Sequence, residues 1–480
     1  MTSPGTRSEG TPTPPRIVIV GAGIAGLACA ARLLDLSRER GRALDLTILD
    51  SAPRAGGVIS TEHRDGFLVE KGPDCFITEK PWALDLCRRL GLEDQVIGTN
   101  PECRRSFVLL RGRILPIPEG YQLMAPGRLW PFATTPILSL AGKLRAACDL
   151  ILPRGAPRDD ESLASFVRRR FGSEVLERLA QPLVAGIYNA DPERLSLRAT
   201  MPRFLEMERR HRSLILALAL ARRRRASPDS GVSGARYSLF VTLRGGLQVL
   251  IDRLVARLPA EALRLGTRAV SLRRDGGRWT VALDGGGRLE ADAVVLAMPA
   301  IGSAPLLRDV EPALADSLGS IRYGTSATVN LGYRLDDIPF PVRGFGFVVP
   351  RSERLSLIAC SFSSVKFERR AGEGTILLRC FTGGEMAEQT TRDDLERAVR
   401  DDLKRSVGLT ASPILSTTSV WPKAMAQYEV GHTDCVKRIE ALLARHPGLA
   451  LAGNGLRGVG IPDCVHSGER AAESTATVIG

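Results

Sequence analysis

Residues Arg16–Leu34 run Arg-Ile-Val-Ile-Val, then Gly-Ala-Gly-Ile-Ala-Gly, then Leu-Ala-Cys-Ala-Ala-Arg-Leu-Leu. The apolar, β-branched run predicts a buried strand, and the alanine- and leucine-rich run predicts a helix. Between them, Gly21 permits a tight turn, Gly23 lets the backbone approach a pyrophosphate, and Gly26 allows close packing of helix and strand. Free N–H groups at the start of the helix favour a bound phosphate. The turn therefore predicts a dinucleotide site, which also includes Ala22, Ile24 and Ala25, and by itself it leaves NAD, NADP and FAD open.

A second strand is predicted over residues 43–49, and Asp50 follows it, 24 residues after Gly26. A carboxylate at that place accepts hydrogen bonds from the ribose of an adenine dinucleotide and disfavours the 2′-phosphate of NADP. The chain continues as Ser51-Ala-Pro-Arg54-Ala-Gly56-Gly57. NAD binding does not require an Arg-x-Gly-Gly there. The pattern looks like the second pyrophosphate-binding element of FAD enzymes related to amine oxidases; the alternative for Arg54 is a solvated loop arginine.

Composition narrows the possible functions. The chain has 480 residues, which is too long for one ordinary core, so we expect two or three structural units. Its net charge is +13, and arginine supplies nearly all of the positive charge. Only 5% of the residues are aromatic and none interleave with arginine in a stacking pattern, which argues against nucleic-acid binding. The nine cysteines are scattered without a Cys-x-x-Cys pair, and the five histidines form no ligand pattern. We therefore expect neither a disulfide framework nor a metal site.

The ends and the apolar segments suggest where the protein resides. Residues 1–15 are rich in Pro, Thr, Ser and Gly, so we expect a disordered tail and, without a basic region leading into an apolar one, no signal peptide. No segment offers about 20 clean apolar residues, which predicts that no helix spans a membrane. The scattered cysteines indicate a reducing compartment. We expect a cytoplasmic protein, with a peripheral place on the cytoplasmic face of a membrane as a further expectation.

Segments far along the chain carry a more specific resemblance. Together with the block at residues 16–57 and with Gly66–Asp74, they make the chain resemble the FAD-dependent protoporphyrinogen oxidases of the oxygen-dependent type, within the amine-oxidase and carotenoid-desaturase group of flavoproteins. Their order and spacing match from residue 16 to about 475. The segments are 107–118, 186–192, 211–216, 243–247, 344–350, 427–432 and 458–464.

The resemblance implies a fold of mixed α/β and α+β class in three parts. A Rossmann-like FAD-binding domain, discontinuous in sequence, is expected over residues 16–75, 239–300 and 440–480. A substrate-binding domain with a mixed or antiparallel sheet is expected over 76–115 and 301–439. Residues 116–238 are expected to form a helical domain that associates with membranes.

One non-covalent FAD per chain is implied. The start of the C-terminal helix would point at the flavin, where its dipole favours an anionic reduced ring. Beyond the six residues from Gly21 to Gly26, the residues expected to bind the cofactor are Asp50, Ser51, Arg54, Gly56, Gly57, Val58, Gly72, Pro73, Asp74, Cys75, Ala269, Trp421, Val459, Gly460 and Ile461.

The implied reaction is the six-electron oxidation of protoporphyrinogen IX to protoporphyrin IX in heme biosynthesis. It would consist of three hydride transfers to FAD, each followed by reoxidation by O2 to give H2O2. Three alternatives stay open: oxidation of coproporphyrinogen III to coproporphyrin III, another flavoprotein of the amine-oxidase group, and a Rab-escort-like binding protein without flavin chemistry.

For the substrate, the resemblance implies a backbone carbonyl at Gly186 facing the macrocycle and apolar contacts from Leu331 and from Phe345 or Phe347. It also implies a propionate-binding arginine directly before the aromatic residue Phe107. Ser106 occupies that position here, after Arg104 and Arg105. A one-residue shift in a strand turns the side chain to the other face, so Arg105 serves only if a bulge or bend re-aims it, and Arg104 is the alternative.

The implied partners are the porphyrinogen, O2, a membrane surface, a second copy of the chain and ferrochelatase. The apolar run at residues 213–221 has basic flanks, which leaves two interpretations open. It is either an interfacial helix that dips into a membrane or a buried helix with solvated arginine ends.

Overall fold

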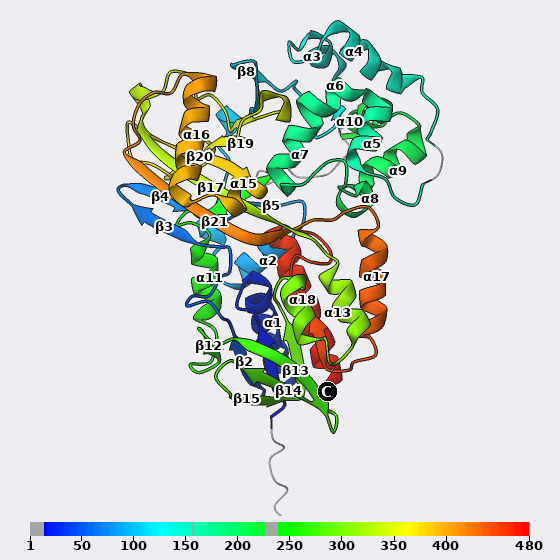
Figure 1. Ribbon diagram of the computed structural model, residues 1–480, viewed down its shortest axis with the longest axis vertical. Helices are drawn as coiled ribbons and strands as arrows, with labels where there is room; N and C mark the ends of the chain where they lie inside the picture. The colour runs from blue at the N-terminus through cyan, green and yellow to red at the C-terminus, as the bar shows by residue number, and fades with distance from the viewer. Residues whose placement is uncertain (1–13, 156–157, 226–238, 480) are drawn as a thin grey trace, which may run out of the picture.

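The computed structural model describes residues 14–155, 158–225 and 239–479 of the protein. The tail predicted for residues 1–15 lies outside the described residues except for Pro14 and Pro15. Figure 1 shows three parts: a lower part around α1 and α18, an upper sheet backed by α16, and a helical part beside that sheet.

A five-stranded parallel sheet forms the centre of the lower part. Its strand order is β12 (Leu263–Arg264), β2 (Asp45–Leu49), β1 (Arg16–Val20), β16 (Ala293–Leu296) and β22 (Leu449–Leu451). Apart from the two-residue edge strand β12, these strands are short and mostly apolar, as expected for a parallel sheet that is buried on both faces.

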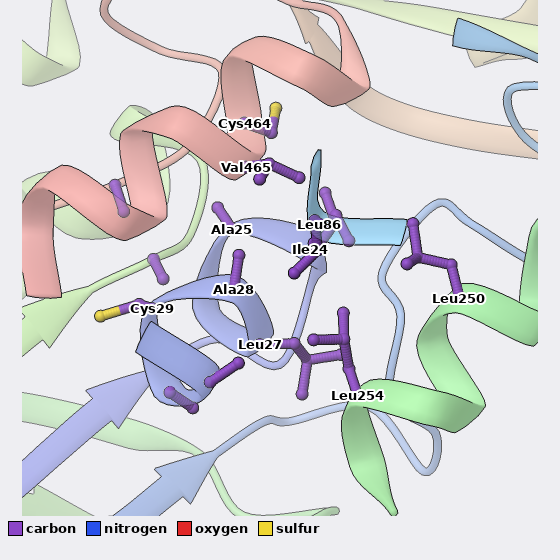
Figure 2. Packing of buried hydrophobic residues seen from close by; sticks show 14 of the residues in the cluster. Ile24, Ala25, Leu27, Ala28, Cys29, Leu86, Leu250, Leu254, Cys464 and Val465 are labelled. Atoms are coloured by element: carbon purple, nitrogen blue, oxygen red, sulfur yellow. The ribbon is translucent and has the colours of Figure 1, made fainter. Parts of the chain in front are cut away.

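Helix α1 (Ile24–Arg40) follows β1 and is the central helix of this part. It ends at Gly41, whose left-handed φ of +62° is readily available only to glycine. Figure 2 shows its two apolar sides: Ala25 and Ala28 lie towards α18 (Ile461–Val478), and Leu27 lies towards α11 (Gln248–Val255). A Cβ atom at Gly468 of α18 would lie only 2.1 Å from the Ala25 carbonyl oxygen, so the small residue allows the two helices to touch.

Smaller elements surround this core. Three short sheets are formed by β3 (Thr61–Arg64) with β4 (Phe67–Glu70), by β5 (Phe76–Ile77), β11 (Phe240–Leu243) and β6 (Val96–Gly98), and by β13 (Ala269–Asp275), β14 (Arg278–Leu283) and β15 (Arg288–Ala291). The surrounding helices are α2 (Trp82–Arg89), α12 (Ala300–Leu306), α13 (Pro312–Gly319) and α17 (His432–Leu443).

The upper sheet has seven strands and is mixed, because β18 and β7 pair in parallel while the other neighbours are antiparallel. Helix α16 (Arg392–Val407) buries Val399 and Leu403 against one face of it. The strand order is β21 (Leu415–Ala426), β17 (Tyr323–Arg334), β20 (Thr375–Gly383), β19 (Ala359–Phe362), β18 (Gly346–Val348), β7 (Phe107–Leu110) and β8 (Arg113–Pro116). The short helices α14 (Ser363–Lys366) and α15 (Glu385–Gln389) flank β20.

The helical part has its own buried core. Within it, α10 buries Leu214, Ile215, Ala217 and Leu218, which favours the buried-helix interpretation of the apolar run over the interfacial one. Its elements are β9 (Tyr121–Gln122), β10 (Ala125–Pro126), α3 (Leu129–Thr134), α4 (Leu140–Ala147), α5 (Leu163–Phe171), α6 (Ser173–Val175), a π-helical turn at Leu176–Ala180, α7 (Gln181–Tyr188), α8 (Leu197–Thr200), α9 (Pro202–His211) and α10 (Leu214–Arg225). Among the residues that the structure describes, no helix is both long enough and apolar enough to cross a bilayer.

Candidate functional site

The predicted cofactor residues gather at one edge of the parallel sheet. Strands β1, β2, β16 and β22 are parallel, so their carboxyl ends lie together, and ligands bind at that edge in open α/β sheets. The predicted glycine turn follows β1, Asp50 follows β2, and Val459–Ile461 lead into α18, which packs on α1. Chain segments more than 400 residues apart therefore meet there.

The three glycines of the turn have different surroundings. Gly21 has a φ of +112°, and a Cβ there would lie 2.5 Å from the Ala297 carbonyl oxygen. A Cβ at Gly26 would lie 1.9 Å from the Gly21 carbonyl oxygen. At Gly23, in contrast, a Cβ would meet no atom within 4 Å. The backbone at Gly23 is therefore open to a ligand, while the other two glycines are required by the fold, as the sequence motif predicts.

Asp50 and Arg54 hold the loops beside this turn. The Asp50 carboxylate accepts hydrogen bonds from the backbone N–H groups of Ala22, at 2.7 Å, and Ala52, at 2.8 Å. Arg54 donates to the carbonyl oxygens of Ala55, Gly57 and Ile59, so it is not the freely solvated loop arginine of the alternative. Burial lowers the pKa of the Arg54 guanidinium, and the Asp50 carboxylate offsets part of that effect. Both side chains give the loop between them a fixed shape.

The other predicted cofactor residues adjoin this edge. Gly56 donates to the Ala22 carbonyl oxygen at 2.8 Å, next to the bridge between Gly23 and Gly56, while Gly57 and Val58 are exposed. Ser51 is exposed beside Asp50, and the Asp50 carbonyl oxygen accepts from Thr267, two residues before Ala269.

Trp421 joins the upper sheet to this edge. Its Nε1 donates to the Lys71 carbonyl oxygen at 2.7 Å, and the Arg54 guanidinium carbon lies 5.6 Å from the centre of its ring. Thr328 of β17 donates to the same carbonyl oxygen at 3.1 Å. The loop Lys71–Cys75, which contains the predicted cofactor residues Gly72, Pro73, Asp74 and Cys75, is thus held against the upper sheet.

The register of the upper sheet separates its two faces. Asn330 of β17 pairs with Arg379 of β20 and with Thr417 of β21, and residues directly opposite one another share a face. We call this side, which also carries Thr328 and Trp421, the loop-facing face. Because successive side chains alternate, Leu331 points to the other side.

Two of the predicted substrate residues lie on that other side. Leu331 and Phe347 are fully buried in the hydrophobic core that includes Val399 and Leu403 of α16. Side chains enclosed between the sheet and α16 are not placed for the direct substrate contact expected of them. A family motif locates the strand, but a shift of one residue selects the opposite face.

The remaining substrate candidates lie elsewhere. Gly186 of α7 faces Val348, since a Cβ at Gly186 would lie 3.9 Å from a Val348 methyl carbon. Val348 pairs with Ala359, Ala359 pairs with Phe381, and Phe381 pairs with Thr328, so Val348 belongs to the loop-facing face. Arg105 is exposed, and its carbonyl oxygen accepts a hydrogen bond of 2.7 Å from the Phe345 N–H. Arg104 and Ser106 are exposed as well.

Lys366 and Arg379 were not predicted from the sequence. Lys366 Nζ donates to Asp74 at 3.0 Å and to the Cys75 sulfur at 3.2 Å. Arg379 donates to the Gly72 carbonyl oxygen. An arginine inside the apolar run Leu377-Leu378-Arg379-Cys380-Phe381 is itself a sequence signal, because a buried charge requires a partner.

Comparison with known proteins identifies the class. The family model of flavin containing amine oxidoreductases matches residues 24–475. A coproporphyrinogen III oxidase of Bacillus subtilis strain 168 is 35% identical over 96% of this chain and 98% of its own. A chloroplastic protoporphyrinogen oxidase of Nicotiana tabacum is 31% identical over 95% of this chain and 85% of its own.

Solved structures agree with this class. One from Exiguobacterium sp. 255-15, provisionally assigned as a protoporphyrinogen oxidase, has a TM-score of 0.84 at 32% identity and covers 96% of this chain and 98% of its own. Cyclohexylamine oxidase from Brevibacterium oxydans IH-35A, at 17% identity, shares the fold with a TM-score of 0.69 over 97% of this chain and 100% of its own.

The chain therefore belongs to the flavin containing amine oxidoreductase family. It is an oxidoreductase with FAD as its cofactor, and the resemblance seen in the sequence is confirmed. The Rab-escort-like alternative finds no support among these relatives. The residues present fit the cofactor, because Gly23 is open to a ligand and the buried Arg379 retains two nitrogens, Nε and Nη1, that have no hydrogen-bond partner among the described residues.

Proposed function

We propose that the protein oxidises a porphyrinogen to the corresponding porphyrin, with protoporphyrinogen IX as the substrate. The observation that carries this proposal is the match over nearly the whole length of both chains to enzymes named for porphyrinogen oxidation. Bound FAD would supply the hydride acceptor for three two-electron oxidations, six electrons in all, and O2 would take up two electrons and two protons per round to give H2O2. No strong acid or base among the residues is needed, because the product is aromatic.

One group of residues would bind the cofactor, and another would face the substrate. The residues that would hold the cofactor are Gly21–Gly26, Asp50, Ser51, Arg54, Gly56, Gly57, Val58, Gly72–Cys75, Ala269, Trp421 and Val459–Ile461. Gly186 and Val348 would face the macrocycle, because α7 lies there against the loop-facing face of the sheet. In this proposal Val348, rather than Leu331 or Phe347, provides the apolar contact.

The same assignment gives the domain organisation. We propose a discontinuous, Rossmann-like FAD-binding domain over residues 16–75, 239–300 and 440–480, supported by the five-stranded parallel sheet whose strands come from all three segments. Residues 76–115 and 301–439 would form the substrate-binding domain, and 116–238 the helical domain.

Coproporphyrinogen III is the second candidate substrate. It is favoured by relatives in Bacillus subtilis and Propionibacterium freudenreichii, which are 35% and 36% identical and are named coproporphyrinogen III oxidases. The exposed Arg105 supports this candidate as well, because an arginine that does not grip one fixed propionate selects less strictly between the two porphyrinogens.

The deciding experiment follows porphyrin fluorescence after addition of each porphyrinogen to the FAD-loaded protein, with FAD alone as the control. We expect both porphyrinogens to be oxidised faster than in the control, and the ratio of the two kcat/KM values assigns the substrate. If neither rate exceeds the control, porphyrinogen oxidation is the wrong function.

A membrane contact is proposed for the helical part, on a surface other than α10. Trp130 is 79% exposed, Leu140 74% and Ile151 75%, and Leu129 and Leu144 are exposed as well. These five residues, which we call the apolar patch, lie on or next to α3 and α4 (Figure 1). With basic residues such as Lys143 nearby, the patch suits an anionic membrane surface on the cytoplasmic side. A homodimer and a complex with ferrochelatase stay predictions.

A further inference from the structure

The loop Gly72–Cys75 is held by two cations, Arg379 of β20 in the upper sheet and Lys366 of the flanking helix α14. We propose that Lys366 and Arg379 are positioning residues for the flavin: they fix the backbone and the charge of this loop, and through it they set how tightly FAD is held. The inference rests on the proposed contact between the loop and FAD.

Arg379 fixes the first half of the loop. It stands in β20, its side chain is 3% exposed, and it donates to the Gly72 carbonyl oxygen. Its Nη1 lies 3.6 Å from the Asp74 carboxylate. On another side, Gly72 lies close against the backbone of Val58, because a Cβ at Gly72 would be only 1.8 Å from the Val58 carbonyl oxygen. The loop is therefore enclosed between β20 and the segment around Val58.

Lys366 fixes the second half. Its side chain is 13% exposed and lies at the end of α14, where its Nζ donates to Asp74 and to Cys75. The aromatic rings of Phe240 and Phe367 lie 5.7 Å and 5.0 Å from the ammonium group. Aromatic rings and a carboxylate around the ammonium group restrict the positions that it can occupy, so its hydrogen bonds hold this end of the loop in one position.

Two cations, Lys366 and Arg379, face the carboxylate of Asp74. Burial alone would raise the pKa of the Asp74 carboxyl, but Lys366 and Arg379 outweigh it and hold that pKa well below its ordinary value. Arg379 keeps donor capacity at Nε and Nη1, and the amide of Asn330 beside it also has no partner among the described residues. Buried groups of this kind call for a hydrogen-bonding partner, and a group bound beside Gly72 supplies one.

The test compares Lys366→Met, Asp74→Asn/Lys366→Met and the control Lys437→Met. Lys437 forms a similar pair with Asp434 at 3.2 Å, but that pair is exposed on α17. For each FAD-loaded protein, one measures the rate of FAD release, from flavin fluorescence after dilution, and the urea midpoint of unfolding at saturating FAD. Lys366→Arg serves as the conservative variant that keeps the charge.

We expect Lys366→Met to lower the unfolding midpoint and to speed FAD release about tenfold, since a charge-assisted hydrogen bond is lost. The double variant also replaces the Asp74 carboxylate, which has lost Lys366 and keeps only the more distant Arg379 at 3.6 Å, by a neutral amide, so most of the midpoint returns while release stays fast. Lys366→Arg and Lys437→Met keep slow release. If release in the double variant returns to the wild-type rate together with the midpoint, the pair is merely structural and the proposal is wrong.

These outcomes do not depend on the substrate. A protein that oxidises no porphyrinogen would still release FAD at measurable rates, so failure of the proposed reaction and failure of the positioning role are distinguishable. If Lys366→Met yields no folded protein, the double variant and Lys366→Arg carry the comparison.

Discussion

The guanidinium group of Arg54 lies over the indole ring of Trp421, 5.6 Å from its centre, although 367 residues separate the two in sequence. Trp421 donates a hydrogen bond to the Lys71 carbonyl oxygen, where the loop Lys71–Cys75 starts. Arg54 donates to the carbonyl oxygen of Ile59, in the turn that adjoins the loop. The contact places the loop of Arg54, the predicted second pyrophosphate-binding element, beside the upper sheet.

Replacing Trp421 with Phe removes the hydrogen bond to the Lys71 carbonyl oxygen and part of the indole but keeps an aromatic ring beside Arg54. We expect FAD affinity to fall about fivefold, since one hydrogen bond contributes about 1 kcal/mol. Trp421→Ala, which also removes the ring, should lower it further. Fluorescence titration of FAD into the protein measures both; equal affinities for Trp421→Ala and the wild type would contradict the placement.

Alanine substitutions at Gly23 and Gly26, in the glycine turn after β1, should affect FAD binding and stability differently. Gly23→Ala adds a methyl group to open space, so we expect unchanged unfolding without FAD but at least about tenfold weaker FAD binding, because close backbone approach is blocked. Gly26→Ala places a Cβ against the Gly21 carbonyl oxygen and should destabilise the protein by about 1–3 kcal/mol. Urea unfolding and FAD titration separate the two effects. Loss of stability in Gly23→Ala would contradict the open site.

Glu70, directly before the loop, should make stability depend on pH. Burial raises the pKa of the Glu70 carboxyl to about 7. The hydrogen bonds from Thr61 and Leu247 and the charges of Arg370 and Arg379 lower this pKa, but their combined effect is smaller than that of burial. The folded state therefore binds this proton more tightly than the unfolded state. Stability is fully present below the ordinary pKa and is lost as the pH rises through about 7, by about 3 kcal/mol between pH 4 and pH 8.

The variant Glu70→Gln cannot ionise and should lack this component, which urea unfolding at several pH values measures. Glu290→Gln, in an exposed position on β15, is the matched control and should keep it. An unchanged pH dependence in Glu70→Gln would show that other groups cause it.

The helical part depends on a buried ion pair. Arg170 and Asp149 are 1% and 0% exposed, and Arg170 Nε donates to Asp149 at 2.7 Å. Asp149 also accepts from Ser213 and from the Ile215 N–H, which ties the start of α10 to α5. Asp149→Ala removes a buried carboxylate partner of Arg170 and leaves Glu208, at 3.4 Å from Nη1, as the remaining carboxylate, so we expect a loss of about 3 kcal/mol in unfolding free energy. The exposed pair of Arg308 and Asp316 offers the control, since Asp316→Ala should cost at most about 1 kcal/mol.

Membrane docking through the apolar patch can be tested by sedimentation with anionic phospholipid vesicles. Trp130→Glu should reduce the bound fraction strongly, with an affinity loss of about tenfold or more, because burial of a large side chain contributes about 1.5–3 kcal/mol. Ile414→Glu, at an exposed apolar residue outside the patch, should bind as the wild type does. Equal binding by Trp130→Glu and wild type, or none by wild type, would rule out docking through the patch.

Residues close together in sequence carried most of what could be predicted. The run from Arg16 to Leu34 predicts strand, turn and helix, because an apolar run, three spaced glycines and an alanine-rich run each act locally. Asp50 and Arg54 follow within the next strand and loop, so the choice of FAD over NADP needs no distant contact. The order of later motifs then indicated the porphyrinogen-oxidising relatives.

Tertiary structure alone decided which side chains meet. Leu331 and Asn330 are neighbours in β17, yet one faces α16 and the other faces the loop, because side chains alternate along a strand and the motif does not reveal the register. Burial of α10 and exposure of the apolar patch depend on how the helices pack. Lys366 meets Asp74 across 292 residues, a pairing that no local pattern encodes because only the folded sheet brings β20 and its flanking helix to the loop.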